Sequence, residues 1–122
     1  MVKEILIIED EKAQAEGLKK ALQQELSSHN FSCVFEEEKM IYAIENKFFN
    51  LAIVDLRMDK FSINGIELIE KIIEVNPFSK IIIVSAYLVD FFLLNCTNIG
   101  FIEYDIFNFL NNVFKIPIKK QF

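Results

Sequence analysis

Residues 51–69 read LAIVDLRMDKFSINGIELI and combine an apolar run, an aspartate, a polar loop and the start of a helix. The run at residues 51–54 is apolar throughout, which is typical of a strand buried on both faces of a sheet. Asp55 follows the strand, and apolar residues then recur at helical spacing until the stop near Pro77: Ile66, Ile69, Ile72 and Ile73. The segment therefore predicts one strand, loop and helix unit.

The same unit recurs on both sides of this segment. Before it, residues 5–8 and 31–35 predict strands, and helices are indicated by Ala15, Leu18, Leu22 and Leu26 and by Ile41, Ile44 and Phe48. After it, residues 81–84 predict a strand, 88–95 a helix, 101–103 a strand, and Ile106, Leu110 and Val113 a last helix. Strict alternation implies right-handed crossovers and a parallel sheet with helices on both faces. The predicted class is doubly wound α/β.

The composition favours one compact domain. The chain has 122 residues, of which 52% are hydrophobic and 25% are charged. We expect residues 1–116 to form the domain and residues 117–122, PIKKQF after Ile116, to be a tail. A net charge of −5 with one arginine argues against nucleic-acid binding, because phosphate contacts need clustered Lys and Arg.

The stretch after Lys80, IIIVSAYLVDFFLLNCTNIGFI, is nearly uncharged and raises the question of a membrane span. A span needs about 20 mostly apolar residues. Ser85, Asp90 and several other polar residues interrupt this one, so we expect buried strands and a helix, and no membrane association. The first residues, MVKEILIIEDE, lack the pattern of a signal peptide, and we expect a cytoplasmic protein.

Polar residues follow the predicted strands, at the edge of the sheet where open α/β proteins bind ligands. They are Glu9 and Asp10, Asp55, Ser85, and Tyr104 with Asp105. Carboxylates gathered in one crevice raise each other's pKa unless a cation lies between them, and oxygen ligands suit Mg²⁺. The alternative for Glu9 and Asp10 is a role at the N-terminus of the following helix.

Other chemistries find little support. The three glycines fall in no phosphate-binding pattern, and the single histidine lies in the wrong region for a Ser-His-Asp triad. A carboxylate, a metal and a hydroxyl remain, which are the groups used in aspartyl phosphate chemistry.

These motifs together resemble the receiver domain of two-component response regulators over essentially the whole chain. The segments that carry the resemblance are ILIIEDE, LAIVDLRMDKFSINGIELI and IIIVSAY. It implies a flavodoxin-like sheet of order 2-1-3-4-5 with Gly65 opening the third helix. It also implies the following roles: Asp55 as phosphoacceptor, Glu9, Asp10, Asp55 and the Arg57 carbonyl as Mg²⁺ ligands, Ser85 as the hydroxyl contact to the phosphoryl group, and Phe101 as the switch aromatic.

The chain departs from this family at three places. Tyr104 stands where a lysine is usual after the fifth strand, and Asp105 follows it. Asp59 replaces a usual proline, and the loop from there to Gly65 is longer than the common pattern. The connection after Ser85 is short, which predicts a stunted fourth helix over residues 88–95. The missing lysine removes a cation that would offset phosphoryl charge.

The resemblance implies a signalling receiver rather than an enzyme. A sensor histidine kinase or phosphotransfer protein would donate the phosphoryl group, and the face of helix 4, strand 5 and helix 5 would relay the signal. The alternative is a pseudo-receiver, a protein interaction module that works without phosphorylation. A metal-dependent phosphatase is less favoured, because no general acid is evident.

Phenylalanine is concentrated in the C-terminal part of the chain. Phe91, Phe92, Phe107, Phe109 and Phe114 exceed what the inner faces of two short helices need. Exposed apolar patches mark interfaces, which favours a homodimer or an output partner on this face. Equally, these residues could fill a core left loose by a short fourth helix.

Overall fold

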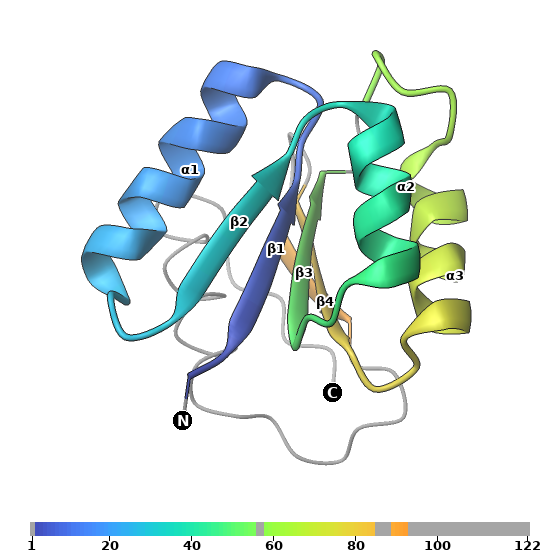
Figure 1. The fold of residues 1–122 in the computed structure, drawn as a ribbon. Helices are drawn as coiled ribbons and strands as arrows, with labels where there is room; N and C mark the ends of the chain where they lie inside the picture. The colour runs from blue at the N-terminus through green and yellow to red at the C-terminus, as the bar shows by residue number, and fades with distance from the viewer. Residues whose placement is uncertain (1, 56–57, 85–88, 93–122) are drawn as a thin grey trace.

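A computed structural model describes residues 2–55, 58–84 and 89–92. Strands and helices alternate as far as the fourth strand (Figure 1). The elements are β1 Glu4–Ile8, α1 Lys12–Glu25, β2 Asn30–Val34, α2 Glu37–Asn46, β3 Leu51–Asp55, α3 Gly65–Val75, β4 Lys80–Val84 and β5 Val89–Phe92. The alternation predicted for residues 5–84 is thereby confirmed.

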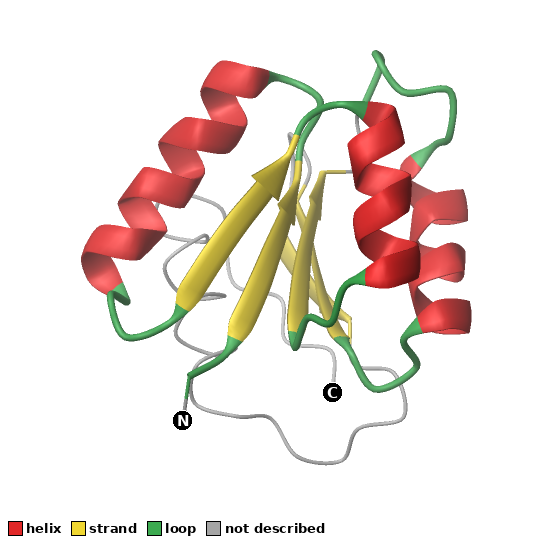
Figure 2. Ribbon diagram, viewed as in Figure 1, coloured by secondary structure: helices red, strands yellow, loops and turns green. Residues whose placement is uncertain are grey.

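The strands form one sheet of order β2-β1-β3-β4-β5. Pairs β1 with β2, β1 with β3, and β3 with β4 are parallel. Each parallel step needs a crossover, and the helices supply it: α1 covers one face of the sheet, while α2 and α3 cover the other (Figure 2). The fold is the predicted α/β class with helices on both faces.

The core explains why the strand sequences are apolar throughout. Alternate residues of a strand point to opposite faces. Ile5, Ile7 and Ile53 pack with Leu22 of α1 in one buried cluster. Leu6, Ile8 and Val54 pack in a second cluster, which holds Met40 and Ile44 of α2 together with Leu68 and Ile72 of α3. Because both faces of these strands are buried, they lack the alternating polar residues of a strand with one face in solvent.

The predicted fourth helix at residues 88–95 is wrong at Val89–Phe92, which form β5. This strand pairs antiparallel with β4, with Val84 opposite Val89 and Ile81 opposite Phe92. An antiparallel neighbour needs only a tight turn, whereas a parallel one needs a crossover of about a dozen residues. The short distance in sequence between β4 and β5 fits this antiparallel pairing, and β-branched and aromatic residues favour a strand. The predicted strand at residues 101–103 and the last helix lie outside the described residues.

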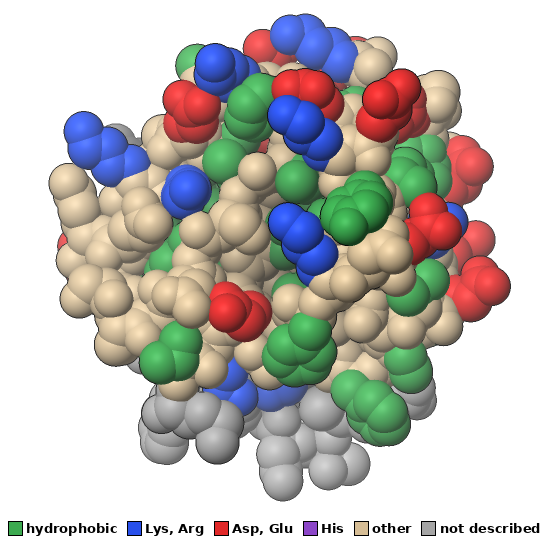
Figure 3. Space-filling model, viewed as in Figure 1, with side chains coloured by type: hydrophobic (Ala, Val, Ile, Leu, Met, Phe, Trp, Pro, Cys, Tyr) green, Lys and Arg blue, Asp and Glu red, His purple; other side chains and the backbone are tan. Residues whose placement is uncertain are grey.

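Two apolar residues used to predict helices do not lie on buried helix faces. Phe48 lies beyond the end of α2 at Asn46 and is exposed, while its neighbour Phe49 is buried. Ile66 is in α3 as predicted but faces outward. On the face seen in Figure 3, basic and acidic side chains alternate with apolar ones and form no continuous patch of one charge.

Among the helices that the structure describes, none has the length and apolarity to cross a lipid bilayer. The predicted tail at residues 117–122 lies outside the described part of the chain.

Candidate functional site

The C-terminal ends of β1 and β3 bring three carboxylates together. The strands are neighbours, with Ile8 opposite Val54, so the next residues, Glu9 and Asp55, extend from the same edge of the sheet. One carboxylate oxygen from each of Glu9, Asp10 and Asp55 lies within 4.8 Å of the other two. The sequence predicted these three residues as one group, and the structure brings them together.

Burial makes it unfavourable for all three carboxylates to be ionised at once. Asp10 is only 6% exposed, and Glu9 and Asp55 are partly exposed. The pKa of Glu9 is raised from 4.5 to about 9, mainly by burial, with contributions from hydrogen bonds with the Asp55 and Asp10 side chains and from the Asp55 charge. The Glu11 amide, 3.1 Å from Glu9 Oε1, lowers the pKa of Glu9 but does not offset the increase. A proton on Glu9 is therefore favoured at neutral pH in the metal-free chain, mainly because burial disfavours the charged carboxylate and the neighbouring carboxylates add to this effect.

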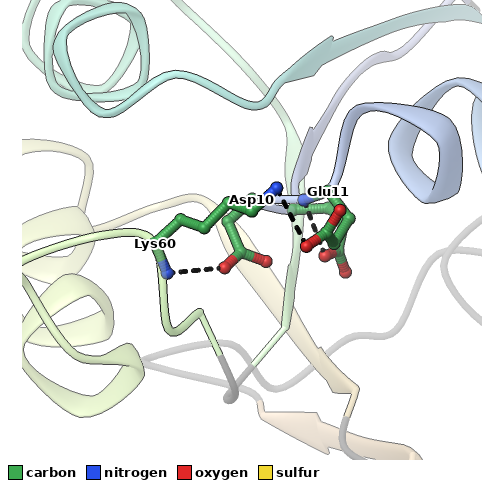
Figure 4. Close-up of polar contacts among 4 residues, drawn as sticks. Asp10, Glu11 and Lys60 are labelled. Atoms are coloured by element: carbon green, nitrogen blue, oxygen red, sulfur yellow. Dashed lines mark hydrogen bonds and ion pairs between the residues drawn. The ribbon is translucent and has the colours of Figure 1, made fainter.

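Figure 4 shows Lys60, from the loop that follows β3, beside Asp10 and Glu11. We call the described residues of this loop, 58–64, the β3–α3 loop. The Lys60 amide donates a hydrogen bond of 2.9 Å to Asp10 Oδ2. The Lys60 ammonium lies 3.0 Å from Glu11 Oε1. One residue of this loop thus contacts both Asp10 and the next residue along the chain.

The β3–α3 loop is fixed by further contacts. Met58 and Phe61 are buried in the cluster beneath α2 and α3. Glu37, in the first turn of α2, accepts hydrogen bonds at Oε1 from the Ser62 amide, the Ser62 hydroxyl and the Ile63 amide. Contacts from two sides therefore hold the loop against the site.

The structure does not place Glu9 or Asp10 at the N-cap of α1, which was the alternative role for these residues. The N-cap of α1 is Glu11, and its side chain makes no capping hydrogen bond. The Glu9 carboxylate does accept from the Glu11 amide, which ties the turn after β1 to the carboxylate group.

The remaining predicted site residues are Arg57, Ser85, Phe101 and Tyr104, and all lie outside the described residues. The sequence analysis missed two residues that the structure places around the group, Lys60 and Glu37. Lys60 stands in the lengthened loop after Asp55, but no spacing rule connects it with Asp10. Glu37 is remote in sequence from the loop that it holds.

The donor set fits a hard divalent cation. Mg²⁺ takes oxygen ligands and is commonly held by one or two carboxylates together with waters. Here the three carboxylates are close enough to share one ion, and the proton held by Glu9 occupies a position where positive charge is favoured. Glu9, Asp10 and Asp55 are the residues that would hold the ion.

Solved structures resemble this chain in fold. A response regulator receiver domain protein from Methanospirillum hungatei is 28% identical with a TM-score of 0.62, over 89% of this chain and 74% of that chain. The response regulator TrrA from Thermotoga maritima, in complex with Mg²⁺ and beryllium fluoride, is 29% identical with a TM-score of 0.61, over 70% of this chain and 71% of that chain. A receiver domain from Methylobacillus flagellatus has the same fold at 22% identity and a TM-score of 0.61, over 71% and 72% of the two chains.

No curated protein matches the sequence. The family model of the response regulator receiver domain matches residues 5–104, which include every described strand and helix apart from the first residue of β1. With the strand order, the carboxylate group and this match in agreement, the chain belongs to the response regulator receiver domain family.

Proposed function

We propose that this receiver accepts a phosphoryl group on Asp55 with Mg²⁺ held by Glu9, Asp10 and Asp55. The observation that carries the proposal is the approach of these three carboxylates to within 4.8 Å at the ends of neighbouring strands. The backbone carbonyl of Arg57 is proposed as a further ligand. The chain then works as a signalling module rather than an enzyme, and a sensor histidine kinase or phosphotransfer protein is the donor.

The chemistry is an in-line displacement at phosphorus. An Asp55 carboxylate oxygen forms a bond to phosphorus while the bond from phosphorus to the phosphohistidine nitrogen breaks, and the nitrogen keeps the electron pair. A bound Mg²⁺ supplies positive charge that neutralises the phosphoryl oxygens. Asp55, at the end of β3, provides the nucleophile from a rigid strand whose neighbouring residues are buried.

The relay step involves residues after β4. We propose that the Ser85 hydroxyl contacts the phosphoryl group, that Phe101 responds as the switch aromatic, and that Tyr104 stands at the position of the usual lysine. The output surface is proposed in the C-terminal part of the chain, where β5 replaces the helix first predicted. Phosphorylation replaces the single negative charge of the Asp55 carboxylate by an acyl phosphate with a charge of about −1.5 to −2, which biases the conformation of the residues around it.

The Phe-rich C-terminal part is also proposed as the contact with a second copy or an output protein. Sedimentation of Phe92→Asp against the parent chain tests the homodimer. A dimeric parent and a monomeric variant support it, whereas two monomers contradict it.

Acetyl phosphate tests the central step. Incubation with acetyl phosphate and Mg²⁺ should transfer one phosphoryl group to Asp55 and release acetate, which intact-mass measurement detects as one added phosphate. Asp55→Asn should show no gain. Asp59→Asn is the matched control, since Asp59 is exposed in the adjacent loop and lies outside the carboxylate group, and it should still gain phosphate. The absence of any gain in the parent chain would favour the pseudo-receiver.

A further inference from the structure

The charge around the carboxylate group sets a requirement for a cation. Glu9, Asp10 and Asp55 share the site, and Glu11 lies next to them through its amide contact with Glu9. On phosphorylation the Asp55 carboxylate, which carries one negative charge, becomes an acyl phosphate with a charge of about −1.5 to −2, while one Mg²⁺ adds only two positive charges. A phosphorylated site therefore still has an excess of negative charge that a nearby ammonium would relieve.

The backbone of Lys60 is held beside this site. Its amide donates to Asp10 Oδ2 at 2.9 Å, and the buried Phe61 follows it directly. The hydrogen bonds from Ser62 and Ile63 to Glu37 fix the chain just beyond. Contacts on both sides therefore fix the position of the Lys60 backbone, from which its side chain extends.

The ammonium of Lys60, in contrast, is weakly held. It pairs with Glu11 Oε1 at 3.0 Å, but the Lys60 side chain is 62% exposed and that of Glu11 is 47% exposed. Exposed ion pairs contribute little, because water and salt screen them. A lysine carries its charge on a flexible four-carbon stem, so the ammonium can exchange one oxygen partner for another at low cost. A charged phosphoryl oxygen offers the ammonium a strong, charge-assisted hydrogen bond.

We propose that Lys60 supplies the cation that contacts the phosphoryl group on Asp55, its ammonium leaving Glu11 when that group is bound. This inference rests on the proposed function and adds to it a phosphoryl-binding residue in the β3–α3 loop. Lys60 then has two roles at the same site: its amide holds Asp10, and its side chain balances the phosphoryl charge.

A purely structural role for the ammonium is the competing explanation. In that case the Lys60 side chain would only hold the loop by its pair with Glu11. The two explanations differ for Glu11→Gln, which removes the pair but keeps the ammonium. A structural role predicts the same defect for Glu11→Gln as for Lys60→Met, whereas the proposed role predicts a defect for Lys60→Met alone.

Beryllium fluoride with Mg²⁺ provides a probe of this contact that does not depend on turnover. Its binding to the full chain is followed by the shift in melting temperature, and Mg²⁺ alone is titrated in parallel. Lys60→Met keeps the apolar stem and should weaken beryllium fluoride binding by about tenfold or more, since hydrogen bonds to charged groups have that strength. The affinity for Mg²⁺ alone should be unchanged or higher, because a positive charge near the ion is removed.

The control variants separate the outcomes. Lys60→Arg keeps the charge and should restore most of the binding. Lys39→Met removes the lysine of a somewhat more exposed ion pair, between Lys39 of α2 and its N-cap residue Glu36, and should bind beryllium fluoride within about twofold of the parent. Retained binding in Lys60→Met, or an equal loss in Glu11→Gln, overturns the inference while leaving the proposed function intact. If the parent chain binds no beryllium fluoride and gains no phosphate, the proposed function fails and the inference fails with it.

Discussion

Glu37 Oε1 lies 2.6 Å from the hydroxyl and 2.8 Å from the amide of Ser62, so that one carboxylate oxygen joins the start of α2 to the β3–α3 loop. The same oxygen accepts from the Ile63 amide at 3.1 Å. These bonds satisfy donors of an irregular segment that has no strand or helix partners of its own. The Lys60 amide of the same loop donates a hydrogen bond to Asp10. By holding the loop, Glu37 therefore helps to keep this bond to the carboxylate site in place.

Replacing Glu37 should therefore loosen the loop. In Glu37→Ala we expect faster hydrogen exchange at the Ser62 and Ile63 amides and a lower melting temperature, because both amides lose their acceptor. Hydrogen exchange with mass spectrometry measures the first effect. Glu38→Ala changes the next residue of the same helix turn and is the control, with exchange in residues 60–64 expected to match the parent. Unchanged exchange in Glu37→Ala would show that the loop is held by its buried residues alone.

The Glu37 contact should also depend on pH. The hydrogen bonds from Ser62 and Ile63 hold the pKa of Glu37 below its ordinary value of 4.5. A depressed pKa in the folded chain means that the stabilisation is fully present above pH 4.5 and is lost as pH falls through the lower folded pKa. Urea unfolding of the parent and of Glu37→Gln should diverge less as the buffer becomes more acidic below that pH. A constant difference across this range would contradict the assignment.

Glu9 should give the opposite pH dependence in the chain without metal. Its folded pKa is raised from 4.5 to about 9, so folding takes up a proton between these values. The stability associated with Glu9 is complete below pH 4.5 and is lost as pH rises through about 9. In EDTA, the free energy of unfolding of the parent should fall over this window, and Glu9→Gln should flatten the fall, since glutamine imitates the protonated acid. Glu38→Gln should leave the slope as in the parent.

Asp10 should have opposite effects on the metal-free and metal-bound chains. Asp10→Asn removes one of the crowded charges and keeps an oxygen for the Lys60 amide, so without metal the melting temperature should hold or rise. Millimolar Mg²⁺ should raise the melting temperature of the parent and leave that of Asp10→Asn unchanged. Differential scanning calorimetry with and without Mg²⁺ measures both effects. Asp59→Asn, which alters an aspartate outside the carboxylate group, should respond to Mg²⁺ as the parent does.

Short-range patterns predicted the parts of the fold that are buried on one or two defined faces. Apolar runs such as residues 5–8 and 51–54 form central strands, because a strand that is buried on both faces needs apolar side chains at every position. The group of Glu9, Asp10 and Asp55 followed from the rule that the ends of parallel strands meet at one edge.

Prediction from the sequence failed where the residues of a segment are compatible with either a helix or a strand. Val89–Phe92 is apolar except for Asp90 and is too short for periodicity to assign, whereas its pairing with β4 shows that it is a strand. Contacts between distant segments were also beyond the sequence, as with Lys60 beside Asp10 and Glu37 beside Ser62. These contacts depend on how the β3–α3 loop folds back, and the sequence marks only its unusual length.

The N-cap at the start of α3 provides a test of how the β3–α3 loop ends and the helix begins. Asn64 is the N-cap, and its Oδ1 accepts from the Glu67 amide at 2.9 Å. Asn64→Ala should lower the free energy of unfolding by about 1 kcal/mol, because the first turn of α3 loses its cap. Asn64→Asp should retain the cap and the stability. Glu36→Ala is the matched control, since Glu36 is the N-cap of α2 but makes no side-chain capping bond, and its effect should be smaller. Equal losses in Asn64→Ala and Glu36→Ala, measured by urea unfolding, would show that the Asn64 hydrogen bond adds nothing to the stability of α3.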